Sequence, residues 1–275
     1  MEASQDYQTH KDKVVRMAKI HDTAVIHPEA KIGRNVEIGP YTTIGENVEI
    51  KENTVIGPHV VIDGWTTIGK NNEIYHGATI GIAPQVKDFD GEKSEVVIGD
   101  NNTIRENVDI HRGTNSGGGE TRIGNNNFIM AYCHIANDCQ LGDNIIMTNA
   151  SHLSGQVKVD DKAVIAGLTE IEKGVRIGTI AMVGAHSRVI NDVPPYILVD
   201  GHPAQVKNIN VIGLRRNGFK PALRKQLKCI YKILYRSDLN IKAAIKKMEQ
   251  EIDYSCEELE HFLEFLRTVE GGICR

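Results

Sequence analysis

An aliphatic residue recurs every six positions along most of this chain, and this period limits the possible folds more than any other feature. The column contains twenty-six such residues in three runs, 20–80, 98–110 and 123–189. An amphipathic helix is excluded, because its apolar residues recur about every 3.6 positions. Three short strands of one hexad each can instead form a triangular coil that buries one aliphatic side chain per strand and stacks on the next coil.

The residues between the aliphatic positions suit the corners of such a coil. Gly-Asp-Asn-Asn at 99–102 and Gly-Asn-Asn-Asn at 124–127 tolerate the left-handed backbone that tight corners require. Aromatic residues make up only 5% of the chain, so the apolar content is aliphatic and evenly spread. The pattern predicts a left-handed parallel β-helix of hexapeptide repeats over residues 20–192, after an N-terminal extension over 1–19.

The hexad fails at two places, 81–97 and 112–121. The first segment contains Pro84 and Gly91, and the second is rich in glycine. Loops that project from a rigid solenoid commonly carry binding residues, although insertions are also tolerated there without a function. We therefore expect two projecting loops, one or both of which contribute to a binding site.

Over residues 193–275 the sequence predicts a connector followed by a C-terminal α-helical domain, with helices over 221–236, 239–252 and 256–268. Basic and acidic residues are separated along this part of the sequence, although the net charge of the whole chain is only −4. Twelve Lys or Arg and one acid lie between Lys207 and Lys247, and seven acids and no Lys or Arg lie between Glu249 and Glu264. Either the basic face captures an acidic partner, or the helix faces pair with each other. No nucleic-acid-binding motif accompanies the charge.

The chain contains no apolar stretch of the roughly 18 residues that span a bilayer, and its first nineteen residues are polar. We therefore expect no integral membrane segment. Its five cysteines show neither a CxxC motif nor a disulfide-like spacing. This odd number of cysteines without such a spacing favours a cytoplasmic protein.

Several motifs carry a resemblance to a known family. They are Asn-Glu-Ile-Tyr at 72–75, His-Arg-Gly-Thr at 111–114, His-Ile-Ala-Asn-Asp-Cys at 134–139, Asp-Val-Pro-Pro-Tyr at 192–196 and Gly-Leu-Arg-Arg-Asn-Gly-Phe at 213–219. Over residues 20 to about 236 the chain resembles the UDP-N-acetylglucosamine O-acyltransferases of the lipid A pathway. Hexads specify only a superfamily, whereas the His-Arg-Gly-Thr and Gly-Leu-Arg-Arg motifs are far more specific.

The resemblance implies a homotrimer with active sites in the clefts between neighbouring β-helices. It implies transfer of a 3-hydroxyacyl group from acyl carrier protein to the 3-hydroxyl of UDP-N-acetylglucosamine. A histidine acts as the general base, and a backbone N–H, here that of Gly155, stabilises the oxyanion. Neither a cofactor nor a metal is implied.

The match departs from the family at its most informative position. The family motif reads His-x-x-His-Asp-Cys, and its second histidine, the base, falls at Asn137, next to Asp138. An amide cannot accept a proton near neutral pH, so activity is expected to be impaired. The other positions that the resemblance assigns to substrate binding are Lys87, Asp88, His111, His152, Gln156, Glu172, Lys173, Asn210, Arg215 and Arg216, and Ala185 is assigned to acyl-chain length.

Spacing suggests what the remaining residues do. Gly155 lies eighteen residues after Asn137, and His152 lies eighteen after His134, so each pair is expected to stack in adjacent coils. His134 is the candidate for a surviving base, and like-charge repulsion within the stacked pair could keep one ring neutral. Three alternatives remain open: a non-catalytic paralogue that binds nucleotide-sugar or carrier protein, an acetyl-CoA-dependent sugar acetyltransferase, and a metal-dependent carbonic anhydrase using His111 with the two stacked histidines.

Overall fold

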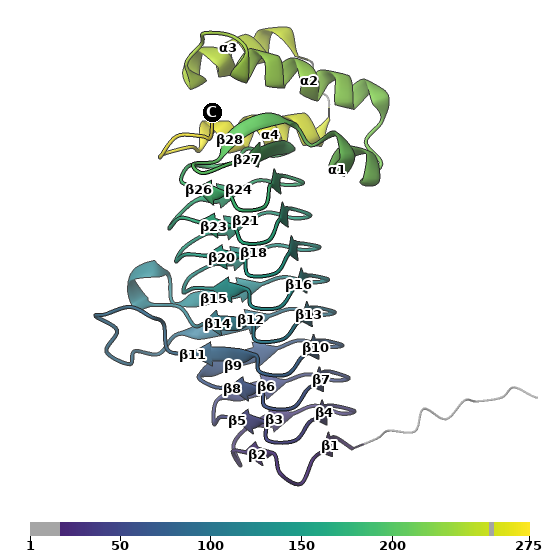
Figure 1. Ribbon diagram of the computed structural model, residues 1–275, viewed down its shortest axis with the longest axis vertical. Helices are drawn as coiled ribbons and strands as arrows, with labels where there is room; N and C mark the ends of the chain where they lie inside the picture. Colours follow the sequence, from purple (N-terminus) through teal and green to yellow (C-terminus); the bar gives the residue numbers. More distant parts are fainter. Residues whose placement is uncertain (1–16, 253–255) are drawn as a thin grey trace, which may run out of the picture.

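Short parallel strands stack into three sheets, which form the three sides of a long solenoid (Figure 1). The computed structural model describes residues 17–252 and 256–275, so most of the predicted N-terminal extension lies outside the described residues. The predicted β-helix is confirmed, because each strand pairs in parallel with the strand one coil further along the chain.

The eleven-stranded sheet contains, in spatial order, β1 (Lys19–Ile20), β4 (Glu37–Ile38), β7 (Val55–Ile56), β10 (Glu73–Ile74), β13 (Thr103–Ile104), β16 (Phe128–Ile129), β19 (Ile146–Met147), β22 (Val164–Ile165), β25 (Met182–Val183), β27 (Ile197–Asp200) and β28 (Gln205–Ile209). The nine-stranded sheet contains β2 (Val25–Ile26), β5 (Thr43–Ile44), β8 (Val61–Ile62), β11 (Thr79–Ile82), β14 (Asp109–His111), β17 (His134–Ile135), β20 (His152–Leu153), β23 (Glu170–Ile171) and β26 (Arg188–Val189). The eight-stranded sheet contains β24 (Arg176–Ile177), β21 (Lys158–Val159), β18 (Gln140–Leu141), β15 (Glu120–Ile123), β12 (Glu95–Ile98), β9 (Trp65–Ile68), β6 (Val48–Ile50) and β3 (Lys31–Ile32).

The aliphatic column forms the core. From Ile38 to Val189 its members are buried, whereas Ile20 at the open end of the solenoid is 43% exposed. Because successive residues of a strand point to opposite faces, the residue before each buried aliphatic points outward. The hexad therefore determines which side chains face solvent and which can build a site.

The corners have the left-handed backbone that the sequence predicted. Asn101 and Asn126 have φ values of 58° and 57°. Larger residues adopt the same conformation elsewhere, for example Leu168 with a φ of 57°. Buried asparagines add hydrogen bonds between coils, as where Asn102 Nδ2 donates to the Gly124 carbonyl at 2.9 Å. Stacked corners thus keep consecutive coils in one register.

Both predicted breaks are loops. Residues 83–94 leave the solenoid after β11, and residues 112–119, with the short 3₁₀ helix η1 (Asn115–Gly117), leave it after β14 (Figure 1). Arg112 fastens the first loop, because its guanidinium lies 5.3 Å from the Phe89 ring and 5.7 Å from the Trp65 ring. The two loops project from the same part of the solenoid, as Figure 1 shows.

The end of the solenoid differs from the connector that the sequence indicated. β27 pairs in parallel with β25, so strand pairing continues beyond residue 192, and β28 then folds back antiparallel to β27. The end of the described chain returns to this point, where the Cys274 N–H donates to the Asp192 carbonyl at 2.9 Å.

Four helices follow at this end of the solenoid: α1 (Val211–Arg216), α2 (Pro221–Tyr235), α3 (Ile241–Glu251) and α4 (Glu257–Arg267). The three longer ones agree with the predicted helices to within two residues at every end. Their buried faces pack together through residues such as Leu227, Met248 and Phe262.

The charges of these helices behave in two ways. Arg267 on α4 pairs with Glu249 on α3 at 2.8 Å and with Glu260 at 2.9 Å, so part of the acidic run is neutralised by helix–helix pairing. In contrast, within residues 17–252 and 256–275 no ion pair joins the basic residues of 207–236 to a carboxylate. The basic face of α1 and α2 therefore stays available.

Candidate active site

A column of polar side chains points outward from three consecutive strands of the nine-stranded sheet. Asp109 of β14 pairs in register with His134 of β17, which pairs with His152 of β20. Each precedes a buried aliphatic residue, so the hexad itself turns it outward. The predicted stacking of His134 and His152 is confirmed, with ring centroids 5.8 Å apart.

Asp109 connects two histidines through one carboxylate oxygen. Its Oδ2 lies 2.7 Å from His134 Nδ1 and 3.0 Å from His111 Nε2. The other ring nitrogen of His111, Nδ1, lies 2.7 Å from the Ala83 carbonyl oxygen at the start of the first loop. His111 is 1% exposed and has a protein partner at both nitrogens, so its predicted contact with substrate stays a prediction. The sequence analysis missed Asp109.

These hydrogen bonds change proton affinities. Burial raises the pKa of the Asp109 carboxyl, but the hydrogen bonds from His111 and His134 outweigh burial and hold this pKa well below its usual range. Burial lowers the pKa of His111, but Asp109 and the Ala83 carbonyl outweigh it, so the net effect is a raised pKa. Both shifts favour an ionised Asp109 beside a protonated His111.

Asn137 lies three residues after His134, at the corner between the nine- and eight-stranded sheets. Its Nδ2 donates to Asp138 Oδ2 at 2.7 Å. Asp138 is buried and also accepts from the Thr114 N–H at 2.8 Å and from the Thr114 hydroxyl at 2.7 Å. Asp138 therefore ties the second loop to this corner while it orients the amide of Asn137.

Gly155 stacks on Asn137, as its spacing predicted. The next residue, Gln156, donates its N–H to the Asn137 carbonyl at 2.9 Å, and a Cβ at position 155 would lie 3.3 Å from both polar atoms of the Asn137 amide. The Gly155 N–H has no acceptor in the part of the chain that the structure describes. An N–H of this kind can stabilise an oxyanion that develops beside position 137.

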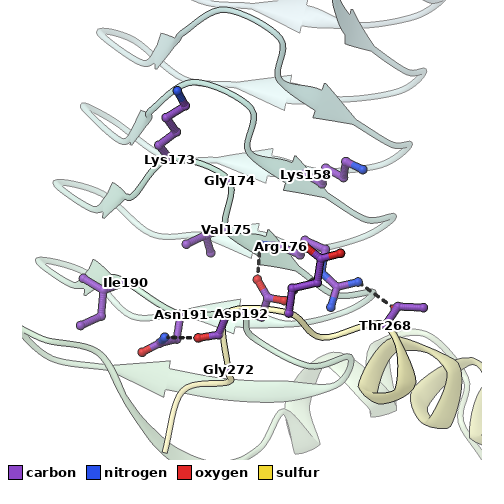
Figure 2. Close-up of a pocket in the computed structure, with 12 residues that line it drawn as sticks. Lys158, Lys173, Gly174, Val175, Arg176, Ile190, Asn191, Asp192, Thr268 and Gly272 are labelled. Atoms are coloured by element: carbon purple, nitrogen blue, oxygen red, sulfur yellow. Dashed lines mark hydrogen bonds and ion pairs between the residues drawn. The ribbon is translucent and has the colours of Figure 1, made fainter. Parts of the chain in front are cut away.

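The same corner column reaches Lys173 in the next coil. Lys173 lines an open groove of about 470 Å³ with Lys158, Arg176 and Thr268, the residue that follows α4 (Figure 2). The neighbouring Glu172 accepts from Arg188 Nη2 at 2.6 Å. Glu172 is thus engaged in an ion pair, whereas Lys173 extends toward solvent.

Other predicted site residues lie elsewhere on this chain. Lys87 and Asp88 are exposed in the first loop, and Arg215 and Arg216 are exposed at the end of α1. Asn210 is nearly buried, because its Oδ1 caps α1 at Gly213 and its Nδ2 donates to the Ile180 carbonyl.

The predicted site residues lie at three different corners of the solenoid, where its three sheets meet. Asn137 lies between the nine- and eight-stranded sheets, Ala185 between the eleven- and nine-stranded sheets, and Ile180, which binds Asn210, at the third corner. A single chain therefore brings together His111, His134, Asn137, Asp138, His152, Gly155 and Gln156, and leaves Ala185, Asn210 and the arginines apart.

A metal ion is not needed to explain the cluster. In the described ranges, Asp109, His111 and His134 form the one group of three such side chains whose possible ligand atoms all lie within 4.8 Å. Hydrogen bonds account for this proximity, and both nitrogens of His111 are already paired. The arrangement suits proton transfer at His134.

Known proteins resemble both parts of the chain. A family model described as Udp N-acetylglucosamine O-acyltransferase, Domain 2, matches residues 192–274, and a bacterial transferase hexapeptide model matches 17–52, 47–81 and 120–155. The acyl-(acyl-carrier-protein)–UDP-N-acetylglucosamine O-acyltransferase of Verminephrobacter eiseniae is 48% identical over 234 residues, which cover 85% of this chain and 89% of the relative. The protein of the same name from Thermodesulfovibrio yellowstonii is 47% identical, with 94% of this chain and 100% of the relative covered.

A solved structure agrees. The UDP-N-acetylglucosamine acyltransferase of Bacteroides fragilis matches with a TM-score of 0.90 at 41% identity, covering 93% of this chain and 99% of that one. This chain belongs to the UDP-N-acetylglucosamine O-acyltransferase family. Family membership confirms the resemblance read from the motifs and gives no support to the carbonic anhydrase and acetyl-CoA alternatives. Among the helices described, none has the length and apolar character to cross a bilayer.

Proposed function

We propose that this chain transfers a 3-hydroxyacyl group from acyl carrier protein to the 3-hydroxyl of UDP-N-acetylglucosamine, the first step of lipid A synthesis. The observation that carries the proposal is the free N–H of Gly155 beside position 137, in the coil directly above His134. Acyl transfer requires an oxyanion donor and a general base, and the Gly155 N–H and His134 are the candidates for these two roles.

The reaction follows from these groups. The sugar 3-hydroxyl attacks the thioester carbon while its proton passes to His134, and the Gly155 N–H stabilises the oxyanion. Collapse of the tetrahedral intermediate breaks the carbon–sulfur bond, and the protonated histidine returns the proton to the leaving thiolate. His134 takes the role of base because the amide of Asn137 cannot accept a proton. Holding the two reactants side by side supplies much of the rate.

A second function is favoured by one observation. The amide of Asn137 already donates to Asp138, so the position that the family motif assigns to the base holds a side chain that is fixed in place and accepts no proton. Such a chain could bind nucleotide-sugar or carrier protein without turnover.

One experiment separates the two functions. Purified protein is incubated with hydroxyacyl carrier protein and UDP-N-acetylglucosamine, and the acylated sugar is quantified by mass spectrometry. Slow, protein-dependent formation of product supports the transferase. Saturable binding of both substrates with no product after prolonged incubation would support the binding protein instead.

The homotrimer is also part of the proposal. Phe128, Ile146, Val164, Met182 and Leu198 point outward from consecutive strands of the eleven-stranded sheet and pair in register. Ile146 is 37% exposed, and such a continuous apolar column is typical of a face covered by a partner. A second copy of this chain suits the apolar face, because Asn137 and Ala185 lie at different corners of one chain and a site that uses both needs one of them from a neighbouring copy.

The basic face of α1 and α2 supports docking of the acidic carrier protein. Lys225, Lys228 and Lys232 are exposed along α2, and Arg215 and Arg216 end α1. Positive charges on one face attract an anionic partner, and this attraction weakens as the salt concentration rises. The cytoplasmic location that the cysteine pattern indicated stays a prediction.

A further inference from the structure

The hydrogen bonds of Asp109 determine which nitrogen of His134 can accept a proton. An ionised carboxylate only accepts hydrogen bonds, so the 2.7 Å contact between Asp109 Oδ2 and His134 Nδ1 requires a proton on Nδ1. In a neutral imidazole the other nitrogen, Nε2, is then the acceptor. In the described part of the chain Nε2 has no protein partner, and the side chain is 23% exposed. The nitrogen of His134 that is left to accept a proton is therefore Nε2.

His111 makes this arrangement stable without adding net charge. Its Nδ1 faces the Ala83 carbonyl and its Nε2 faces Asp109, so both contacts are hydrogen bonds only when both nitrogens carry protons. A protonated His111 beside an ionised Asp109 is a neutral pair. His134 therefore lies next to a neutral pair, and the carboxylate of that pair can stabilise the imidazolium once His134 takes a proton.

We infer that Asp109 is a positioning residue that makes His134 the general base, so that the base has moved from position 137 to position 134. The carboxylate holds Nδ1–H and presents Nε2 to the sugar hydroxyl, the same logic by which a buried aspartate orients a catalytic histidine in hydrolase triads. The inference rests on the proposed function for its chemistry, but the tautomer of His134 can be tested without turnover.

The two carboxylates of the site have different tasks. Asp138 accepts from Thr114 twice and from the amide of Asn137, so its bonds hold a loop and a group that takes no proton. Asp109 accepts only from the two histidines in the part of the chain described. The other titratable groups beside His134 are His152, one strand further along the sheet, and Glu170, in register with His152.

The test is nitrogen NMR of the full-length protein labelled with ¹⁵N-histidine, near neutral pH. Long-range proton–nitrogen correlations distinguish the two neutral tautomers, and the His134→Gln spectrum identifies the signal. The inference expects the wild-type ring of His134 to carry its proton on Nδ1. A proton on Nε2 in the wild-type protein overturns the inference without any variant at Asp109.

Asp109→Asn gives the second measurement, because an amide N–H can donate to Nδ1 and favour the opposite tautomer. We expect the tautomer to switch and kcat to fall by about 10²- to 10⁴-fold, as for loss of a positioned base, with little change in KM. Glu170→Gln is the matched control, since it removes a carboxylate from the same column, and it should change neither the tautomer nor kcat.

The outcomes also separate this inference from the proposed function. Wild-type protein that shows the Nδ1 tautomer but no transfer contradicts the proposed function and leaves the positioning role of Asp109 supported. Active protein whose His134 tautomer is the same in Asp109→Asn contradicts the positioning role and leaves the transferase supported. A fall in kcat that Glu170→Gln reproduces indicates a general effect of charge on the face and also overturns the inference.

Discussion

Asn137→His is the substitution that most directly tests the chemistry of this site. The motif at 134–139 predicts that a histidine here would restore the family's usual base. We expect turnover to rise, because the new ring would add a proton acceptor beside the free N–H of Gly155. The wild-type chain should be slow with hydroxyacyl donors in comparison.

The structure indicates how large the gain should be. Asn137 Nδ2 donates to Asp138 Oδ2 at 2.7 Å, and a histidine Nδ1 stands the same number of bonds from the backbone, so it can make the same bond. Nε2 is then the acceptor. Loss of a positioned base costs about 10²- to 10⁴-fold, but His134 is proposed to supply a base already, so we expect a gain of about 10- to 100-fold.

Steady-state kcat is measured for the wild type, Asn137→His, His134→Ala and the double variant. Asn137→Phe is the control, since it introduces a ring without a proton acceptor. If His134 is the surviving base, His134→Ala removes the activity of the wild type but has a much smaller effect in the Asn137→His background. Equal kcat in the wild type and Asn137→His, or an active His134→Ala single variant, would refute the reasoning and make His152 the next residue to test.

Three further predictions concern assembly and substrates. Ile146→Glu should convert the proposed trimer to smaller species, as measured by light scattering at micromolar concentration, whereas Val97→Glu, at an outward position of the eight-stranded sheet, should not; a wild-type monomer would contradict the proposed shared cleft. Arg216→Glu should weaken carrier-protein binding measured by calorimetry, and an affinity that does not change with ionic strength would exclude charge-guided docking. Ala185→Gly should improve rates with longer acyl donors, because one methyl group corresponds to roughly 0.8 kcal/mol of packing; equal donor preference in both proteins would contradict a role in chain length.

Much of the fold could be predicted because a hexad repeat constrains every coil in the same way. An inward aliphatic side chain sets the register of each strand, and the two segments that break the period became loops. The hairpin of β27 and β28 was missed, because Pro194 and Pro195 indicated a rigid connector, although Ile197 and Val199 alternate as a strand requires. α1 has only six residues, too few to show a helical period.

The site was predictable where the coil is regular and not where it is interrupted. Eighteen residues separate Asn137 from Gly155 and His134 from His152, and both pairs stack as expected. Asp109 and His134 are also in register, but 25 residues separate them because the second loop lies between them. A simple count of eighteen cannot find that pair. Asp109 directly precedes the buried Ile110, so the hexad places its side chain on the outer face, and this position was the signal that could have identified Asp109 as a site residue.

The energetic roles of the two aspartates bear on whether this chain is an enzyme or only a binding protein. A carboxylate removed from water needs compensating hydrogen bonds, and Asp138 has three that anchor a loop and a corner, so the fold alone explains its presence. Asp109 is 31% exposed at its side chain and, among the residues that the structure describes, accepts side-chain hydrogen bonds only from two histidines. A structural role would be met more simply by a neutral residue such as the threonine that occupies the same outward position in β11. The charge of Asp109 is thus best explained by proton chemistry at His134, which favours a working transferase over a protein that only binds.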